Sequence, residues 1–159
     1  MVSLARRLVA AVLGALALAC GVASDTGAQP PVRRPSAQRA TTMKIRIETE
    51  ETTLTATLDD TEAARDFASL LPLTLTLEDY AATEKIATLP RKLTTRGAPP
   101  GADPDVGDLA YYAPWGNLAI YYRDFGYSAG LVKLGQIEGG VEALRRPGNL
   151  RLTISRAEP

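Results

Sequence analysis

Residues 108–122 read Asp-Leu-Ala-Tyr-Tyr-Ala-Pro-Trp-Gly-Asn-Leu-Ala-Ile-Tyr-Tyr, and this stretch decides the fold. Two dense apolar runs, 108–113 and 118–122, flank Pro-Trp-Gly-Asn, whose proline, glycine and asparagine are typical of a turn. Aromatic and β-branched side chains favour strands. The stretch therefore predicts a β-hairpin that carries most of the aromatic residues of the chain.

The β pattern continues on both sides of this hairpin. Residues 43–48 and 53–58 alternate apolar and polar side chains around Glu50-Glu51, which predicts a second hairpin. The same reasoning predicts four more strands, at 73–77, 84–88, 131–137 and 150–155.

One helix interrupts the strands. Residues 62–71 place apolar side chains at helical spacing, a Thr61 or Asp60 cap precedes them, and Pro72 follows. Residues 139–144 predict one further helical turn, and the proline- and glycine-rich residues 96–106 predict a loop. The fold class is therefore mainly β: a closed eight-stranded barrel with one or two short helices, since closure removes exposed sheet edges.

The first nineteen residues predict a signal peptide. Arg6 and Arg7 precede a short apolar run, 8–18, and Ala17-Leu18-Ala19 fits a signal-peptidase cleavage pattern. The run is shorter than the roughly 20 residues that span a bilayer. We expect export by the general secretory route, with a twin-arginine signal as the alternative.

Cys20, the single cysteine, follows directly. Leu18-Ala19-Cys20 resembles the bacterial lipobox, although Ala17 stands where leucine is typical, and this predicts a lipidated Cys20 and a periplasmic or cell-envelope lipoprotein. Ordinary cleavage near Ala19 is the alternative. Residues 20–42, rich in proline and small polar residues, predict a disordered linker to the domain at residues 43–156.

Composition excludes several function classes. The chain has no histidine, which excludes His-based triads, Cys–His nucleophiles and histidine zinc sites. Neither a Walker loop nor a dinucleotide fingerprint is present, so we expect no cofactor and no metal. After residue 40 acidic residues outnumber basic ones, which argues against a nucleic-acid partner.

Several elements in order resemble a bacterial cyclophilin-like family of small barrel proteins. They are the opening Met43-Lys44-Ile45, the helix at 63–71, and Leu71-Pro72, Tyr80, Glu84-Lys85, Leu89-Pro90, Gly107-Asp108, Tyr111-Tyr112, Pro114-Trp115-Gly116-Asn117, Tyr121-Tyr122, Gly135 and Ile137. The resemblance implies an eight-stranded barrel of the cyclophilin type. It carries over no activity, because the arginine-containing stretch and the pocket histidine of cyclophilin prolyl isomerases are both missing here.

Seven residues are candidates for ligand binding: Tyr80, Glu84, Lys85, Tyr112, Trp115, Tyr121 and Arg123. Within each Tyr-Tyr pair one side chain should face the core and the other a surface or groove. Tyr112, Tyr121 and Trp115 could form an aromatic platform, or could simply pack the barrel. Glu84 and Lys85 could act in acid–base chemistry, or form a surface ion pair or a hydrogen-bonded corner. Arg123 could hold a carboxylate, or lie in a solvated turn.

The leading hypothesis is a non-catalytic module that binds a peptide or small ligand, with no assigned catalytic residue. A weak prolyl isomerase, or another acid–base enzyme using Glu84, Lys85, Tyr80 or Arg123, is the alternative, and a purely structural envelope component is a third. The sequence leaves the oligomeric state open.

Overall fold

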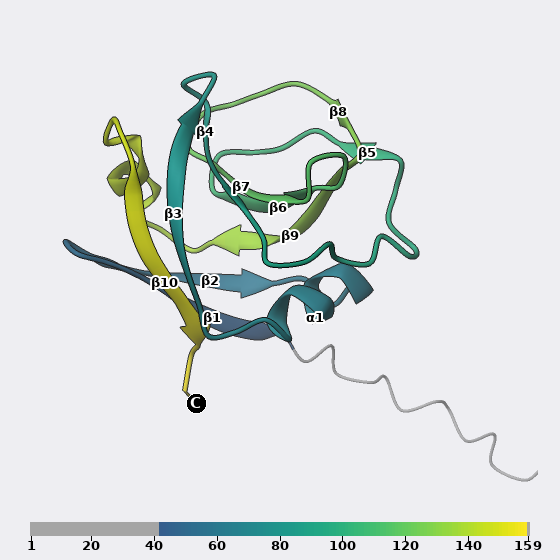
Figure 1. Cartoon of the computed structure of the whole chain (residues 1–159), viewed down its shortest axis with the longest axis horizontal. Helices are drawn as coiled ribbons and strands as arrows, with labels where there is room; N and C mark the ends of the chain where they lie inside the picture. The colour runs from purple at the N-terminus through teal and green to yellow at the C-terminus, as the bar shows by residue number, and fades with distance from the viewer. Residues whose placement is uncertain (1–41, 159) are drawn as a thin grey trace, which may run out of the picture. The chain divides into compact units, whose positions relative to one another are not determined.

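The computed structural model describes residues 42–158 (Figure 1). The predicted signal peptide at 1–19, Cys20 and the linker up to residue 41 lie outside this part. In chain order the elements are β1 (Met43–Thr49), β2 (Thr53–Leu58), α1 (Glu62–Ala68), β3 (Leu73–Tyr80), β4 (Glu84–Thr88), β5 (Gly101–Ala102), β6 (Asp108–Tyr112), β7 (Asn117–Tyr121), β8 (Ser128–Ala129), β9 (Leu131–Ile137), the 3₁₀ helix η1 (Val141–Arg145) and β10 (Leu150–Arg156).

Eight of the strands form a closed barrel in the order β1-β10-β3-β4-β7-β6-β9-β2, in which each strand is antiparallel to both neighbours. Figure 1 shows these strands wrapping around a common interior. The predicted closed eight-stranded barrel is confirmed. The apolar members of the alternating strands, such as Ile45, Ile47 and Ile154, point inward and are fully buried.

The predicted helix is also present, but it is shorter than expected. Thr61 caps it, with its hydroxyl oxygen accepting a hydrogen bond from the backbone N–H of Ala64, and Phe67 enters the barrel core. The helix ends at Ala68 rather than at Leu71, because the N–H groups of Leu70 and Leu71 bond to carbonyl oxygens three residues back instead of four. Among residues 42–158 no helix is both long and apolar enough to cross a membrane.

The β6–β7 hairpin is buried on both of its faces. Tyr111 and Tyr122 point into the main core, as period-two alternation predicts. On the other face, Tyr121 packs with Ala110, Ala119 and Leu131 in a second apolar cluster outside the barrel.

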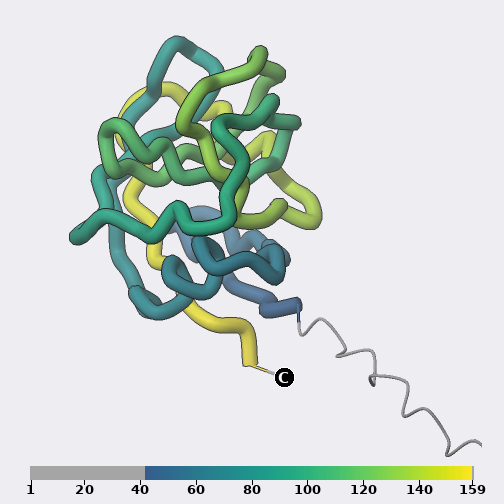
Figure 2. The backbone as a smooth tube through the Cα atoms, turned by 90° about the vertical axis from the view of Figure 1, so that its right-hand side faces the viewer, coloured from purple at the N-terminus to yellow at the C-terminus, as the bar shows by residue number. Residues whose placement is uncertain are grey.

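A small separate sheet of β5 and β8 explains why this outer face is covered. Ala102 of β5 packs against the second cluster, and Figure 1 shows β5 and β8 lying beside β6 and β9. The expected loop at 96–106 therefore contains a short strand. The tube in Figure 2 follows the long loops that bring these two segments together.

Candidate functional site

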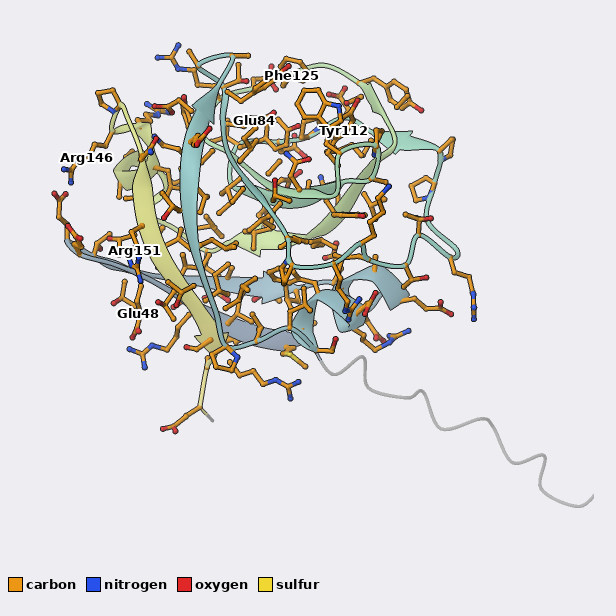
Figure 3. The ribbon with its side chains drawn as sticks, in the orientation of Figure 1. Glu48, Glu84, Tyr112, Phe125, Arg146 and Arg151 are labelled. Atoms are coloured by element: carbon orange, nitrogen blue, oxygen red, sulfur yellow. The ribbon has the colours of Figure 1, made fainter. Side chains whose placement is uncertain are left out.

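Five of the seven candidate residues line one pocket on the outer face of the barrel. Tyr80, Glu84, Tyr112, Trp115 and Tyr121 surround a cavity of about 180 Å³. Figure 3 shows Glu84, Tyr112 and Phe125 gathered in the upper part of the molecule, away from Glu48, Arg146 and Arg151.

Strand register explains why residues far apart in the sequence meet here. Tyr80 of β3 pairs with Glu84 of β4, and Glu84 pairs in turn with Tyr121 of β7. Residues directly opposite each other across antiparallel strands point to the same side of the sheet. The three side chains therefore form one row across the outer surface of the barrel.

The walls of the pocket are aromatic. The Trp115 ring packs edge-on against the rings of Tyr80 and Tyr112, with centroids 5.4 and 5.3 Å apart. Tyr121 packs against Phe125 with centroids 6.2 Å apart. Trp115 is 55% exposed, and Tyr80 and Phe125 are each 42% exposed. Large exposed apolar side chains that gather in one place mark binding surfaces in soluble proteins.

Two buried polar atoms in this pocket have no hydrogen-bond partner: Oε2 of Glu84 and Oδ1 of Asn117. Asn117 is only 5% exposed. Leaving a buried polar atom unpaired costs about 1–3 kcal/mol, and native proteins rarely do so. Both atoms are hydrogen-bond acceptors, and neither has a donor in the pocket.

The carboxyl group of Glu84 has an altered acidity. Burial raises the pKa of Glu84 above its ordinary value, and a hydrogen-bonding interaction with the Tyr121 hydroxyl offsets only part of this effect. The pKa of Tyr121 is also raised, first by burial and then by the neighbouring Glu84. Tyr121 therefore stays protonated and can act as a donor toward the carboxylate.

The turn that connects Tyr80 to Glu84 is strained. Ala81 and Ala82 both have positive φ angles, of 48° and 54°, which residues with a Cβ atom rarely adopt. The carbonyl oxygen of Thr83 accepts hydrogen bonds from the N–H groups of Tyr122 and Arg123, each at 3.1 Å. These bonds tie the turn to the end of β7 and hold the pocket-lining residues in place.

Lys85 lies outside the pocket, although it is adjacent to Glu84 in the sequence. Its side chain is fully buried, and its Nζ lies 2.8 Å from Oδ1 of Asp79. Nζ also donates hydrogen bonds to the carbonyl oxygens of Arg146 and Gly148, at 2.6 and 2.7 Å. Lys85 is therefore a buried, hydrogen-bonded residue and does not form a surface ion pair with Glu84. The ammonium group is saturated with acceptors and ties the η1–β10 connection to the barrel.

Arg123 does not line the pocket either. It is exposed and lies two residues beyond the end of β7. This position matches the solvated-turn alternative.

Sequence reasoning missed three residues that complete the pocket: Asn117, Phe125 and Ser128. The sequence predicts Asn117 in the turn, whereas in the structure it is the first residue of β7 and pairs with Tyr112. Phe125 lies in the loop after β7 and Ser128 begins β8, and the sequence does not define the path of this segment. The one available signal was the pair of exposed aromatic residues, Phe125 and Tyr127, in a short polar segment.

A larger cavity, of about 430 Å³, lies beside α1. Two ion pairs lie within it: Arg65 pairs with Asp60, and Arg96 lies 3.8 Å from Glu62. Lys133 pairs with aspartates outside the cavity, and Asp59 is exposed, so none of the buried polar atoms without a partner lies here. It therefore has no unpaired buried polar group to select a ligand, and we regard the aromatic pocket as the stronger site despite its smaller volume.

The carboxylates of Asp105 and Asp108, on either side of Gly107, form ion pairs with the ammonium group of Lys133. Nζ of Lys133 lies 2.6 Å from Oδ2 of Asp108 and 3.2 Å from Oδ2 of Asp105. Within residues 42–158 no cluster of three or more acidic, histidine or cysteine side chains is arranged to hold a metal ion.

Comparisons with known proteins agree with the architecture. A solution structure of a hypothetical protein from Archaeoglobus fulgidus is similar with a TM-score of 0.56 and 20% sequence identity, over 76% of this chain and 99% of that one. At this identity the likeness concerns the fold alone. No curated protein sequence matches the chain. The sequence model of the Cyclophilin-like family matches residues 47–155, which span the barrel from β1 to β10. The chain is therefore a member of the Cyclophilin-like family.

Proposed function

We propose that this chain is an exported, lipid-anchored cyclophilin-like domain that binds a peptide or small ligand in the aromatic pocket without changing it chemically. The observation that carries the proposal is the pair of unpaired buried oxygens, on Glu84 and Asn117, inside a ring of exposed aromatic side chains. An apolar pocket with a few convergent polar groups is the usual form of a ligand site.

The volume of the pocket limits what enters it. Ligand pockets for whole small molecules usually measure about 300–1,000 Å³, whereas this one measures about 180 Å³. It suits one side chain or one head group. A second cavity of about 300 Å³ adjoins it, because Trp115 and Asn117 line both. A peptide that places one side chain in the first cavity can lay its next residues across the second.

The arrangement favours binding over catalysis. The one buried ammonium group in the described part of the chain, that of Lys85, is held by three acceptors and does not line the pocket. Arg123 is exposed and away from the pocket. Glu84 remains as an acid or base, but it is the only charged side chain among the described residues that line the pocket, so no second charged group works with it.

Trp115 provides a direct test, because it is the only tryptophan and lies on the pocket wall. The purified protein is titrated with acetyl amino-acid methylamides that represent each class of side chain, and tryptophan fluorescence is recorded. We expect a saturable change with at least one class.

A matched pair of variants controls the experiment. Phe125→Ala removes an exposed pocket wall and should weaken binding about fivefold or more. Val106→Ala removes an exposed apolar side chain elsewhere and should leave binding unchanged. If none of the probes changes the fluorescence, the pocket is not a binding site and the proposal is wrong.

A further inference from the structure

We propose that the aromatic pocket is specific for a primary ammonium group, supplied by the lysine side chain of a peptide. This inference rests on the binding function proposed above and names the chemistry of the ligand. It follows from three properties of the pocket: the type of its unpaired atoms, the charge of its walls and the geometry of its rings.

The unpaired atoms call for a donor. Oε2 of Glu84 and Oδ1 of Asn117 are both acceptors, and neither has a partner. A lysine ammonium group carries three N–H donors and no acceptor, so it matches a pocket whose unpaired atoms are acceptors. Alcohols and secondary amides offer a single donor each and no positive charge for Glu84.

The walls carry negative charge. Of the residues that line the pocket and the adjoining cavity, Glu84 and Glu78 are the charged ones, and both are acidic. Burial disfavours the ionised form of Glu84, and an ammonium ion beside the carboxylate would stabilise that form. An anionic ligand would instead meet like charge in a partly desolvated site.

The rings suit a cation with an alkyl chain. Tyr80, Tyr112 and Trp115 stand edge to face, so that their planes enclose the space from different directions. Aromatic faces attract ammonium groups, and their apolar area packs against methylene groups. The four-carbon stem of lysine would lie against these rings while its head group reaches Glu84.

The adjoining cavity indicates a peptide as the source of the amine. Beyond Trp115 and Asn117 it is lined by Thr76, Glu78 and Thr88 on the outer face of the barrel. These side chains offer polar contacts of the kind that a peptide backbone next to the lysine could use. A free amine would leave that cavity without contacts.

The test compares four probes on the purified protein by Trp115 fluorescence. They are acetyl-lysine-methylamide, the norleucine analogue with the same four-carbon chain and no ammonium group, the ε-trimethyl-lysine analogue, and n-butylammonium. We expect the lysine probe to bind at least about tenfold more tightly than norleucine, since hydrogen bonds to a charged group are worth a tenfold factor or more. The trimethyl analogue, which has no N–H donors, and the free amine should both bind more weakly than the lysine probe.

Two variants separate charge from shape. Glu84→Gln keeps the size of the side chain and removes its charge, and it should bring the affinity for lysine down to the level of norleucine. Tyr80→Leu, on an exposed ring, should weaken lysine binding while norleucine binding stays the same. Glu142→Gln, an exposed acid on η1, is the control and should change neither affinity.

The outcomes distinguish this inference from the function on which it rests. Norleucine or trimethyl-lysine binding as tightly as lysine would overturn the ammonium specificity and leave the pocket as a binding site. Butylammonium binding as tightly as the lysine probe would overturn the peptide source. No response to these probes or to any other side-chain class would overturn the binding function itself.

Discussion

Glu84 and Lys85 are neighbours in β4, and their side chains emerge on opposite sides of the barrel wall. Lys85 is 0% exposed and lies 2.8 Å from Asp79, whereas Glu84 lines the outer pocket with an unpaired oxygen. Alternation along a strand separates two adjacent charged residues into different environments. The ammonium group of Lys85 has three acceptors and stabilises the fold, whereas one carboxylate oxygen of Glu84 has no hydrogen-bond donor.

Replacing Lys85 with methionine should destabilise the fold. The variant Lys85→Met keeps much of the packing but leaves Asp79 and the carbonyl oxygens of Arg146 and Gly148 without their donor. We expect a loss of about 1–3 kcal/mol in the free energy of unfolding, measured by urea denaturation. Arg46→Met removes an exposed pair with Glu48 and should cost less than about 1 kcal/mol. Equal effects of the two substitutions would contradict the structural role of Lys85.

The strained turn beside the pocket offers a stabilising substitution. Ala82 has a φ of 54°, a conformation that glycine adopts without steric cost. Ala82→Gly should therefore raise the free energy of unfolding by up to about 1 kcal/mol, despite the greater backbone entropy of glycine in the unfolded chain. Ala87→Gly, within β4, should lower it by a similar amount. A destabilised Ala82→Gly protein would show that the side chains of the turn matter more than its backbone.

Most of the fold follows from local patterns in the sequence. Alternation in residues 43–58 and 150–155 places Ile45, Ile47 and Ile154 in the core, and the Thr61 cap begins the helix where it is expected. These features depend on period and capping, which neighbouring residues determine. Closure of the barrel follows from the number of strands and the cost of open edges.

The site could be predicted only in part. The Tyr pairs and Trp115 stood out because they lie on one hairpin, but the burial of Lys85 depends on carbonyl groups more than sixty residues away. Likewise, Asn117 and Phe125 become pocket walls through strand register and the path of a loop. Contacts between residues far apart in the chain produce no periodic pattern of apolar residues, so a single sequence does not reveal them.

Asp66 should make the stability of the protein depend on pH. A hydrogen bond from Arg91, 2.5 Å away, lowers the pKa of Asp66, and the N–H of Thr94 at 2.8 Å adds to this, while burial opposes it. A carboxyl group with a lowered pKa in the folded state stabilises that state at pH values above the unfolded pKa of about 3.9, and this stabilisation is lost as the pH falls from there through the folded pKa.

The variant Asp66→Asn tests this dependence. It should lose about 1 kcal/mol of stability at pH 7 and progressively less at lower pH, as measured by urea unfolding from pH 7 to pH 3. Asp124→Asn removes an exposed carboxylate and serves as the control for net charge. A difference between Asp66→Asn and the wild type that stays constant over this range would rule out the assigned linkage.

Membrane anchoring is a separate prediction that depends on Cys20 alone. If Cys20 is lipidated after Leu18-Ala19, the protein should fractionate with membranes, and Cys20→Ser should release it into the soluble fraction or block its processing. Ser24→Ala, in the same segment, is the control. Wild-type protein that is already soluble after export would support ordinary cleavage instead.

The last prediction concerns prolyl isomerisation, the main catalytic alternative. The uncatalysed barrier is about 18–20 kcal/mol, and an enzyme lowers it by holding the twisted amide with fixed donors in a site that excludes water. Arginine suits this task because its guanidinium is always charged and has a rigid geometry. Arg123 is the arginine nearest in sequence to the aromatic hairpin, but it is exposed beyond the end of β7 and outside the pocket.

A donor without a fixed position loses most of its catalytic effect. The pocket itself offers Glu84 and Asn117, whose unpaired atoms are acceptors rather than donors to an amide. We therefore expect the purified protein to accelerate the isomerisation of short X-Pro peptides no more than buffer does. The assay compares the wild type, Arg123→Ala and Glu84→Gln at equal concentrations by following the cis-to-trans rate. A clear acceleration by the wild type that either substitution removes would make the domain an enzyme and displace the binding function.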